Sequence, residues 1–225
     1  MSLINQQNLG KYIPADAAMN SNSLIDKKIA YNYPYLLLPY LTTTKHNYAG
    51  KNAVLKINLQ LGTSQQIVGF PEDYRQCDYL WIEPMIMTDG NDIITAFPSS
   101  DEITIHDIST GQRKKINNND QFDNSLTCYD TKLAENLSYD EKYQGSAEKN
   151  MNILQTDSFY YLVKRLKKKS LQSPTQTAVL VFDQSLKHIG TKILAEEVAP
   201  RISFIYDGQL AIYSYAAKCF YLYDI

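Results

Sequence analysis

The sequence has few of the residues that build metal, redox or cofactor sites. Its 225 residues include three cysteines, three histidines and one tryptophan. Cys77, Cys128 and Cys219 are odd in number and far apart, so they form neither a CxxC pair nor a disulfide framework. The histidines lack a metal-binding spacing such as HExxH. We therefore expect buried free thiols, no metal site and no cofactor.

Long apolar runs and a dominant charge are also missing. No window approaches the roughly 18 apolar residues that a membrane-spanning helix needs. The net charge is −2, which gives no reason to expect nucleic acid as a partner. The opening MSLINQQNLGKY has neither the basic nor the apolar region of a signal peptide, so the sequence leaves the location of the protein unknown.

Tyrosine is the abundant residue, with 18 copies in a chain that is 44% hydrophobic. Such a chain can bury a sizeable core. Tyrosine suits half-buried strands, and it also suits surfaces that contact sugars or proteins. Strand packing is the favoured interpretation.

A strand motif recurs along the chain. Four segments end alike, in the order AVLKIN at Asn58, EITIHD at Asp107, AVLVFD at Asp183 and FYLYD at Asp224. After the first three comes a second short strand: QQIVGF, RKKIN or GTKIL. A repeated unit of this kind is typical of an array of small β-sheets.

The loop between these paired segments has its own pattern. Gly62, Gly111 and Lys187 stand four residues after the Asn or Asp. A hairpin loop of this length needs a left-handed residue there, which glycine adopts without steric cost and lysine adopts less well. The Asn or Asp side chain is expected to cap the turn.

A second hairpin precedes each of these units. Its expected turns are near Tyr31-Asn32 and at Asp89-Gly90, Asp157-Ser158 and Asp207-Gly208. Asp-Gly between β-branched and aromatic runs is a strong hairpin signal. Each unit therefore has four antiparallel strands, which is one blade of a β-propeller, and the predicted fold class is all-β.

The spacing divides a single domain, residues 1–225, into four blades. The blades are expected roughly at 22–70, 79–119, 151–195 and 201–225, with a loop insertion at 120–150. The fourth unit is one strand short, and the segment 3–13 is a candidate to supply that strand and close a four-bladed ring. The alternative is part of a larger propeller with further blades.

Four stretches carry a resemblance to a known family: AVLKINLQLGTSQQIVGFPEDY, ITAFPSSDEITIHDISTGQ, VLVFDQSLKHIGTKIL and APRISFIYDGQLAIYSY. They resemble uncharacterised propeller lipoproteins of gut Bacteroides-type bacteria, a domain of unknown function. The resemblance covers about residues 30 to 225. It implies a six-bladed propeller, of which this sequence matches the C-terminal portion, a lipidated leader and a place in the cell envelope. The family brings no catalytic or ligand residues.

Two lengthened loops suggest a binding face, because loops after the second strand of a blade share one face of a propeller. The first and third blades carry LTTTKHNYAGKN and KRLKKKSLQSPTQ there. These segments place cations and a tyrosine together: Lys45, His46, Tyr48, Lys164, Arg165, Lys167, Lys168 and Lys169. One interpretation is a cationic rim for an anionic glycan or an acidic protein partner. The other is a solvated hairpin tip that prevents edge pairing.

Innermost strands offer a second candidate site. Trp81, Glu83 and Arg201 are expected on such strands, where alternate side chains face the central channel. They can contact a small ligand there, or they can be a core residue and inter-blade ion pairs. The run Asp89-Gly90-Asn91-Asp92 has oxygen ligands but no EF-hand spacing, so we expect it to be a turn.

Three functions remain open on the sequence. The favoured one is a non-catalytic binding or scaffolding propeller of the bacterial cell envelope. The second is a propeller hydrolase or lactonase-like enzyme with a metal ion in its channel, for which the innermost strands offer only Asp26, Glu83 and Asn152. The third is a truncated fragment without a function of its own.

Overall fold

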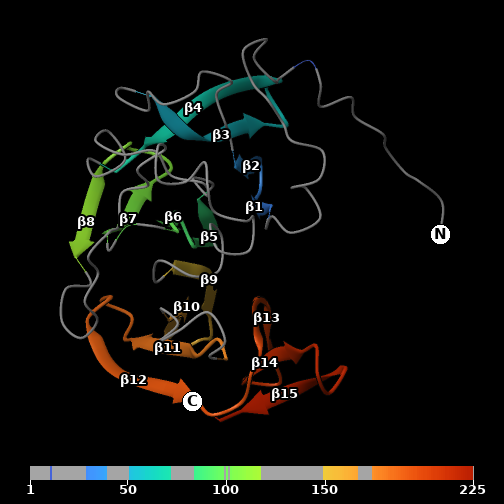
Figure 1. The fold of residues 1–225 in the computed structure, drawn as a ribbon. Helices are drawn as coiled ribbons and strands as arrows, with labels where there is room; N and C mark the ends of the chain where they lie inside the picture. Colours follow the sequence, from blue (N-terminus) through green and yellow to red (C-terminus); the bar gives the residue numbers. More distant parts are fainter. Residues whose placement is uncertain are drawn as a thin grey trace, which may run out of the picture.

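The computed structural model describes residues 11, 29–39, 51–71, 84–98, 100, 102–117, 149–166 and 174–224. Their strands form four separate antiparallel sheets, which are the blades of a β-propeller (Figure 1). In each sheet the strands follow one another in chain order, so each blade is a meander joined by hairpins. The predicted all-β propeller with about four blades is confirmed.

The first two blades have four strands each. Blade 1 contains β1 (Ala30–Asn32), β2 (Tyr35–Pro39), β3 (Asn52–Asn58) and β4 (Thr63–Gly69). Blade 2 contains β5 (Met85–Asp89), β6 (Asp92–Ala96), β7 (Glu102–Asp107) and β8 (Arg113–Asn117).

The last two blades differ by one strand. Blade 3 contains β9 (Lys149–Gln155), β10 (Tyr160–Arg165), β11 (Thr177–Phe182) and β12 (His188–Leu194). Blade 4 contains β13 (Ala199–Tyr206), β14 (Gln209–Ser214) and β15 (Cys219–Tyr223). The described part of blade 4 thus has three strands, as the repeat predicted. The segment 3–13, apart from Lys11, lies outside the described residues.

Three of the four first-hairpin turns fall where the sequence placed them. Asp89 pairs with Asp92 and Tyr206 with Gln209, so the two Asp-Gly predictions are confirmed within a residue. The turn expected near Tyr31-Asn32 lies two residues later, because Asn32 pairs with Tyr35. Pro34 explains the shift, since it lacks the N–H that a strand residue donates and suits the turn better.

The second hairpin loops are capped by the side chain that ends the preceding strand. Asn58 Oδ1 accepts from the Leu61 N–H at 2.9 Å, and Asp107 Oδ1 accepts from the Thr110 N–H at 2.6 Å. Gly62 and Gly111 have φ of 65° and 73°, as predicted for the left-handed position.

The third of these loops follows a different geometry from the one expected. Asp183 Oδ1 caps it by accepting from the Ser185 and Lys187 N–H groups. The left-handed residue, however, is Leu186 (φ 60°) and not Lys187. Leu186 is buried in the core between blades 2 and 3, and this burial offsets the backbone strain of a non-glycine residue at positive φ.

The blades surround a common centre with their first strands innermost (Figure 1). β1 contacts β5, β5 contacts β9 and β9 contacts β13. Neighbouring residues of one strand serve opposite interfaces, because side chains alternate across a sheet. Ile93 packs in the core between blades 1 and 2, whereas Ile94 packs between blades 2 and 3. A third apolar core joins blade 3 to blade 4.

Two buried asparagines of β9 tie blade 3 to both of its neighbours. The Asn150 amide donates to the Phe97 and Ser100 carbonyls of blade 2, at 2.9 and 2.7 Å. The Asn152 amide donates to the carbonyl and the hydroxyl of Ser203 in blade 4, at 3.0 and 2.7 Å. Buried amides bonded in this way hold β9 against the β6–β7 connection of blade 2 and against β13 of blade 4.

Candidate functional site

Most of the predicted site residues lie outside the described part of the chain. These are Lys45, His46, Tyr48, Trp81, Glu83, Lys167, Lys168 and Lys169. Lys164 and Arg165 were expected on the loop after the second strand of blade 3. They instead belong to β10, where 2% and 8% of their surface is exposed, so they do not form an exposed rim.

Arg201 lies on the innermost strand β13, as the sequence predicted, and its side chain is exposed. Its positive charge is close enough to Arg165 to affect the pKa of the Arg165 guanidinium. Burial lowers the pKa of the Arg165 guanidinium to about 10, and the like charge of Arg201 adds to this effect. The structure therefore brings these two cations from blades 3 and 4 into one neighbourhood.

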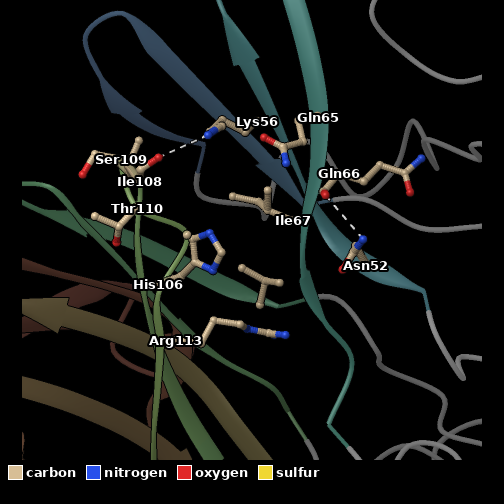
Figure 2. Close-up of a pocket in the computed structure, with 12 residues that line it drawn as sticks. Asn52, Lys56, Gln65, Gln66, Ile67, His106, Ile108, Ser109, Thr110 and Arg113 are labelled. Carbon is tan, nitrogen blue, oxygen red and sulfur yellow. Dashed lines mark hydrogen bonds between the residues drawn. The ribbon is translucent and has the colours of Figure 1, made fainter.

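A pocket of about 370 Å³ lies between the outer strands of blades 1 and 2 (Figure 2). The residues that line it come from β3, β4, β7, β8 and the β7–β8 loop. They are Asn52, Lys56, Gln65, Gln66, Ile67, Val68, His106, Ile108, Ser109, Thr110, Gly111 and Arg113. Among these residues two are formally cationic and none is acidic.

Strand pairing explains why cationic groups converge here. On the blade 1 face that meets blade 2, Lys56 pairs with Leu37 on one side and with Gln65 on the other. On the facing side of blade 2, His106 pairs with Ile93 and with Arg113. Leu37 and Ile93 are both buried in the core between these blades. In both sheets the paired residues thus change from apolar on the second strand to polar on the third and fourth strands. The polar side chains of the two sheets face each other across the pocket.

Lys56 is held in place by contacts to both blades. Its Nζ lies 5.0 Å from the centre of the Tyr35 ring, a cation–π contact within blade 1. The same Nζ donates a hydrogen bond of 3.3 Å to the carbonyl oxygen of Ile108 in blade 2. Neither partner is a carboxylate, so its positive charge is not neutralised by an ion pair with either of them.

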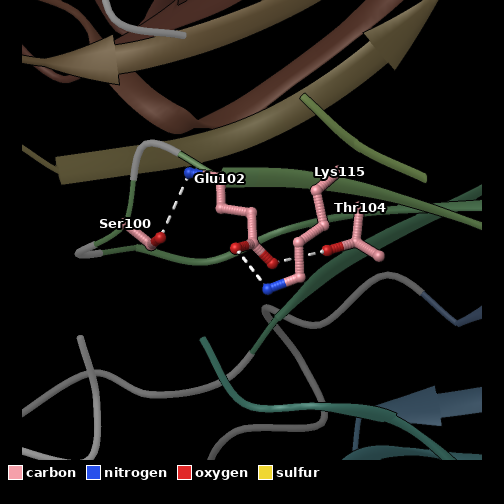
Figure 3. Close-up of polar contacts among 4 residues, drawn as sticks. All are labelled: Ser100, Glu102, Thr104 and Lys115. Carbon is pink, nitrogen blue, oxygen red and sulfur yellow. Dashed lines mark hydrogen bonds and ion pairs between the residues drawn. The ribbon is translucent and has the colours of Figure 1, made fainter. Parts of the chain in front are cut away.

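Arg113 lies against the backbone of blade 1. A Cβ built on Gly69 would stand 3.6 and 3.7 Å from the two terminal guanidinium nitrogens, which places Arg113 beside β4. Lys115, two residues along β8, is different, because its Nζ forms a 2.8 Å ion pair with Glu102 (Figure 3). Within the described residues Arg113 has no such carboxylate, so it keeps its charge directed at the pocket.

The network around Glu102 explains this difference. Its carboxylate accepts from the Thr104 hydroxyl at 3.1 Å as well as from Lys115, and its N–H donates to Ser100 Oγ (Figure 3). Glu102 is therefore engaged at its own end of β7, away from the residues that line the pocket.

His106 forms part of the pocket wall, and within the described part of the chain one of its ring nitrogens lacks a hydrogen-bond partner. Only 8% of its surface is exposed, and its Nδ1 is buried with no hydrogen-bond partner among the described residues. Burial lowers the pKa of the imidazole, the positive charges of Arg113 and Lys56 lower it further, and Asp107 opposes them. His106 is consequently neutral near pH 7.

Asp107, next to His106 in sequence, is committed to the loop. Its Oδ1 accepts from the N–H groups of Ser109 and Thr110 and from the Ser109 hydroxyl at 2.7 Å. Its Oδ2 accepts from the Asn91 amide. The bonds from Thr110 and Ser109 hold the pKa of the Asp107 carboxyl well below its usual range. This carboxylate stabilises the loop and is not turned into the pocket.

Asp89 and Asp92 flank a hairpin turn, as the sequence predicted. The Tyr160 hydroxyl donates to Asp89, which raises the pKa of the tyrosine, although burial is the larger cause. Burial, Asp107 and Asp89 raise the pKa of Asp92. In the described part of the chain no three His, Cys, Asp or Glu side chains are grouped as metal ligands would be.

Sequence reasoning missed the pocket because no motif marks it. Lys56 and Arg113 are 57 positions apart in the chain, and only the packing of two blades joins them. One signal was present. Lys56 is the one charged residue in the segment AVLKIN, and His106 directly precedes the capping Asp107 in EITIHD.

Comparisons with known proteins bear on the fold. No family model matches the chain, and no curated protein does. A solved structure of a DUF4221 family member from Bacteroides vulgatus is similar, with a TM-score of 0.61 and 11% sequence identity. The match covers 87% of this chain and 62% of that one, so the chain spans less than two thirds of the neighbour's length. At this identity the likeness supports the propeller-like fold that the sequence predicted.

The sequence predicted no membrane-spanning segment. Among the described residues no helix is both long and apolar enough to cross a bilayer.

Proposed function

We propose that this propeller is a non-catalytic binding protein of the bacterial cell envelope, and that it binds an anionic glycan in the pocket between blades 1 and 2. One observation carries the proposal: Lys56 and Arg113 face one cavity whose described lining contains no acidic residue. Unpaired like charges in a partly enclosed site repel each other, and an anion removes that repulsion.

The remaining lining supports a sugar as the carrier of the negative charge. Asn52 and Gln65 add amides, and Ser109 and Thr110 add hydroxyls. These groups donate and accept hydrogen bonds and match the hydroxyls of a carbohydrate. Ile67 and Val68 give an apolar strip on one wall, as ligand sites usually have.

Binding is favoured over nucleophilic catalysis by the state of Ser109. This hydroxyl lies near a histidine, but it donates its hydrogen bond to Asp107 at 2.7 Å. A serine nucleophile needs a base that accepts its proton, and here the acceptor is a carboxylate of very low basicity.

The cell-envelope part of the proposal comes from the family resemblance of the sequence. It is tested by fractionating cells that express the native gene and locating the protein among the fractions.

The binding proposal is tested on a glycan array that carries neutral, uronic-acid and sulfated oligosaccharides. Wild-type protein is expected to bind acidic glycans and to ignore their neutral analogues. The double variant Lys56→Met, Arg113→Leu is expected to lose that binding. Lys115→Met is the matched control, because Lys115 is a cation of the same strand as Arg113 but is paired with Glu102 outside the lining. Binding that survives in the double variant overturns the proposal.

A further inference from the structure

We infer that anion binding in the pocket is coupled to proton uptake by His106, so that the affinity rises as the pH falls. This inference rests on the proposed function and adds its regulation. It turns a static cationic site into one that captures its ligand in acid and releases it near neutral pH.

The first support is the unused nitrogen of His106. About nine tenths of this side chain is buried, yet Nδ1 has no partner among the described residues. Buried polar atoms without a partner are rare, because each one loses its hydrogen bonds to water without replacement. Since the imidazole lines the pocket (Figure 2), an anion placed there lies close to the ring.

The second support is the set of charges around the ring. Blade 1 contributes Lys56 from β3, while β4 contributes amide and apolar side chains at the pocket. Blade 2 contributes Arg113 from β8, directly opposite His106, and Ile93 from β6 on the other side. Among the described residues Asp107 is the acid that favours the protonated ring, and its oxygens are already bonded to Ser109, Thr110 and Asn91.

An anion in the pocket reverses this balance. It offsets the charges of Arg113 and Lys56, which oppose protonation, and it accepts a hydrogen bond from the imidazolium. Coupling between two ligands is reciprocal. An anion that favours proton binding to His106 therefore binds more tightly when His106 is protonated. With one linked proton, the affinity increases by at most about tenfold for each pH unit.

Inorganic sulfate is the probe, because its own charge does not change between about pH 5 and about pH 8, where histidine titrates. Isothermal titration calorimetry at several pH values, in buffers of different ionisation enthalpy, measures both affinity and proton uptake. The wild type is expected to bind more tightly as the pH falls and to take up a proton. His106→Gln keeps a polar side chain without a titrating group, and its affinity is expected to follow pH much less.

A second measurement does not depend on the variant. Ring-nitrogen NMR of labelled wild-type protein follows the pKa of His106 with and without sulfate, and we expect sulfate to raise it. Sulfate binding that requires Lys56 and Arg113 but leaves the His106 pKa unchanged overturns this inference and leaves the proposed function standing. Absence of any Lys56- and Arg113-dependent binding across the pH range overturns the proposed function itself.

Discussion

Lys56 of blade 1 donates a hydrogen bond across 3.3 Å to the carbonyl oxygen of Ile108 in blade 2. Both residues line the pocket, so the contact joins its blade 1 wall to its blade 2 wall (Figure 2). The same ammonium group thus has a structural role and a proposed ligand role, and variants must separate the two.

Replacing Lys56 by Met is expected to lower the free energy of unfolding by about 1 kcal/mol. The variant keeps most of the aliphatic chain and loses a charged hydrogen bond and a cation–π contact of modest strength. Urea unfolding measures the change. Lys115→Met is the control, with an effect expected below about 0.5 kcal/mol because an exposed ion pair contributes little. Equal losses in both variants contradict the inter-blade role of Lys56.

The cap formed by Asp107 is expected to depend on its oxygen and not on its charge. Asn58 forms the same cap in blade 1 with a neutral side chain. Asp107→Asn should therefore cost little, whereas Asp107→Ala removes the acceptor of the loop N–H groups and should lower the free energy of unfolding. Thermal and urea unfolding of the two variants measure the difference. A large loss in both variants shows that charge matters more than the geometry of the cap.

The left-handed loop position of blade 2 provides a test of backbone strain alone. Gly111 has φ of 73°, and a Cβ added there would meet no atom within 4 Å. Gly111→Ala is thus expected to destabilise the protein by about 1 kcal/mol through its backbone conformation. Gly190 in β12 has equally open surroundings at an ordinary φ, so Gly190→Ala should be near neutral or stabilising. A reversed order of the two variants contradicts this account.

His106 makes the ligand-free protein less stable in acid. Burial and the cations Arg113 and Lys56 lower its pKa in the folded state, so the unfolded chain binds more protons below about pH 6.5. Stability rises with pH wherever the unfolded state binds more protons. This contribution is fully present above the unfolded pKa and is lost as the pH falls from there through the lower folded pKa.

The His106→Gln variant isolates that contribution, because glutamine does not titrate. We expect the difference in unfolding free energy between variant and wild type to shift in favour of the variant as the pH falls from about 7.5 to about 5. Urea unfolding at each pH measures it. A difference that stays constant with pH contradicts a lowered His106 pKa.

The blades could be predicted from sequence because each strand carries its own local signal. Asn58, Asp107 and Asp183 each cap a turn, and Gly62 and Gly111 adopt the left-handed position assigned to them. Such features depend on neighbouring residues alone. Leu186 was missed because the burial of its side chain, a long-range effect, decides which residue of that loop is left-handed.

The candidate site was predicted poorly for the same reason. Loop length and charge pointed to Lys164 and Arg165, but β10 extends through both and buries them. The pocket needs a lysine of blade 1 and an arginine of blade 2 on facing sides, which follows from how two sheets pack. The strand register predicts which face of its sheet each residue occupies. Which sheet packs against that face is known only from the arrangement of the blades in the ring.

The most direct test of the central claim is where a ligand binds. Backbone amide NMR of the protein, titrated with an acidic oligosaccharide selected on the array, reports this residue by residue. The account predicts shift changes at Gln65–Gly69 on β4 and at Ser109–Arg113 on blade 2, with little change on blades 3 and 4. Changes centred on β9 to β15, with blades 1 and 2 unaffected, would contradict it.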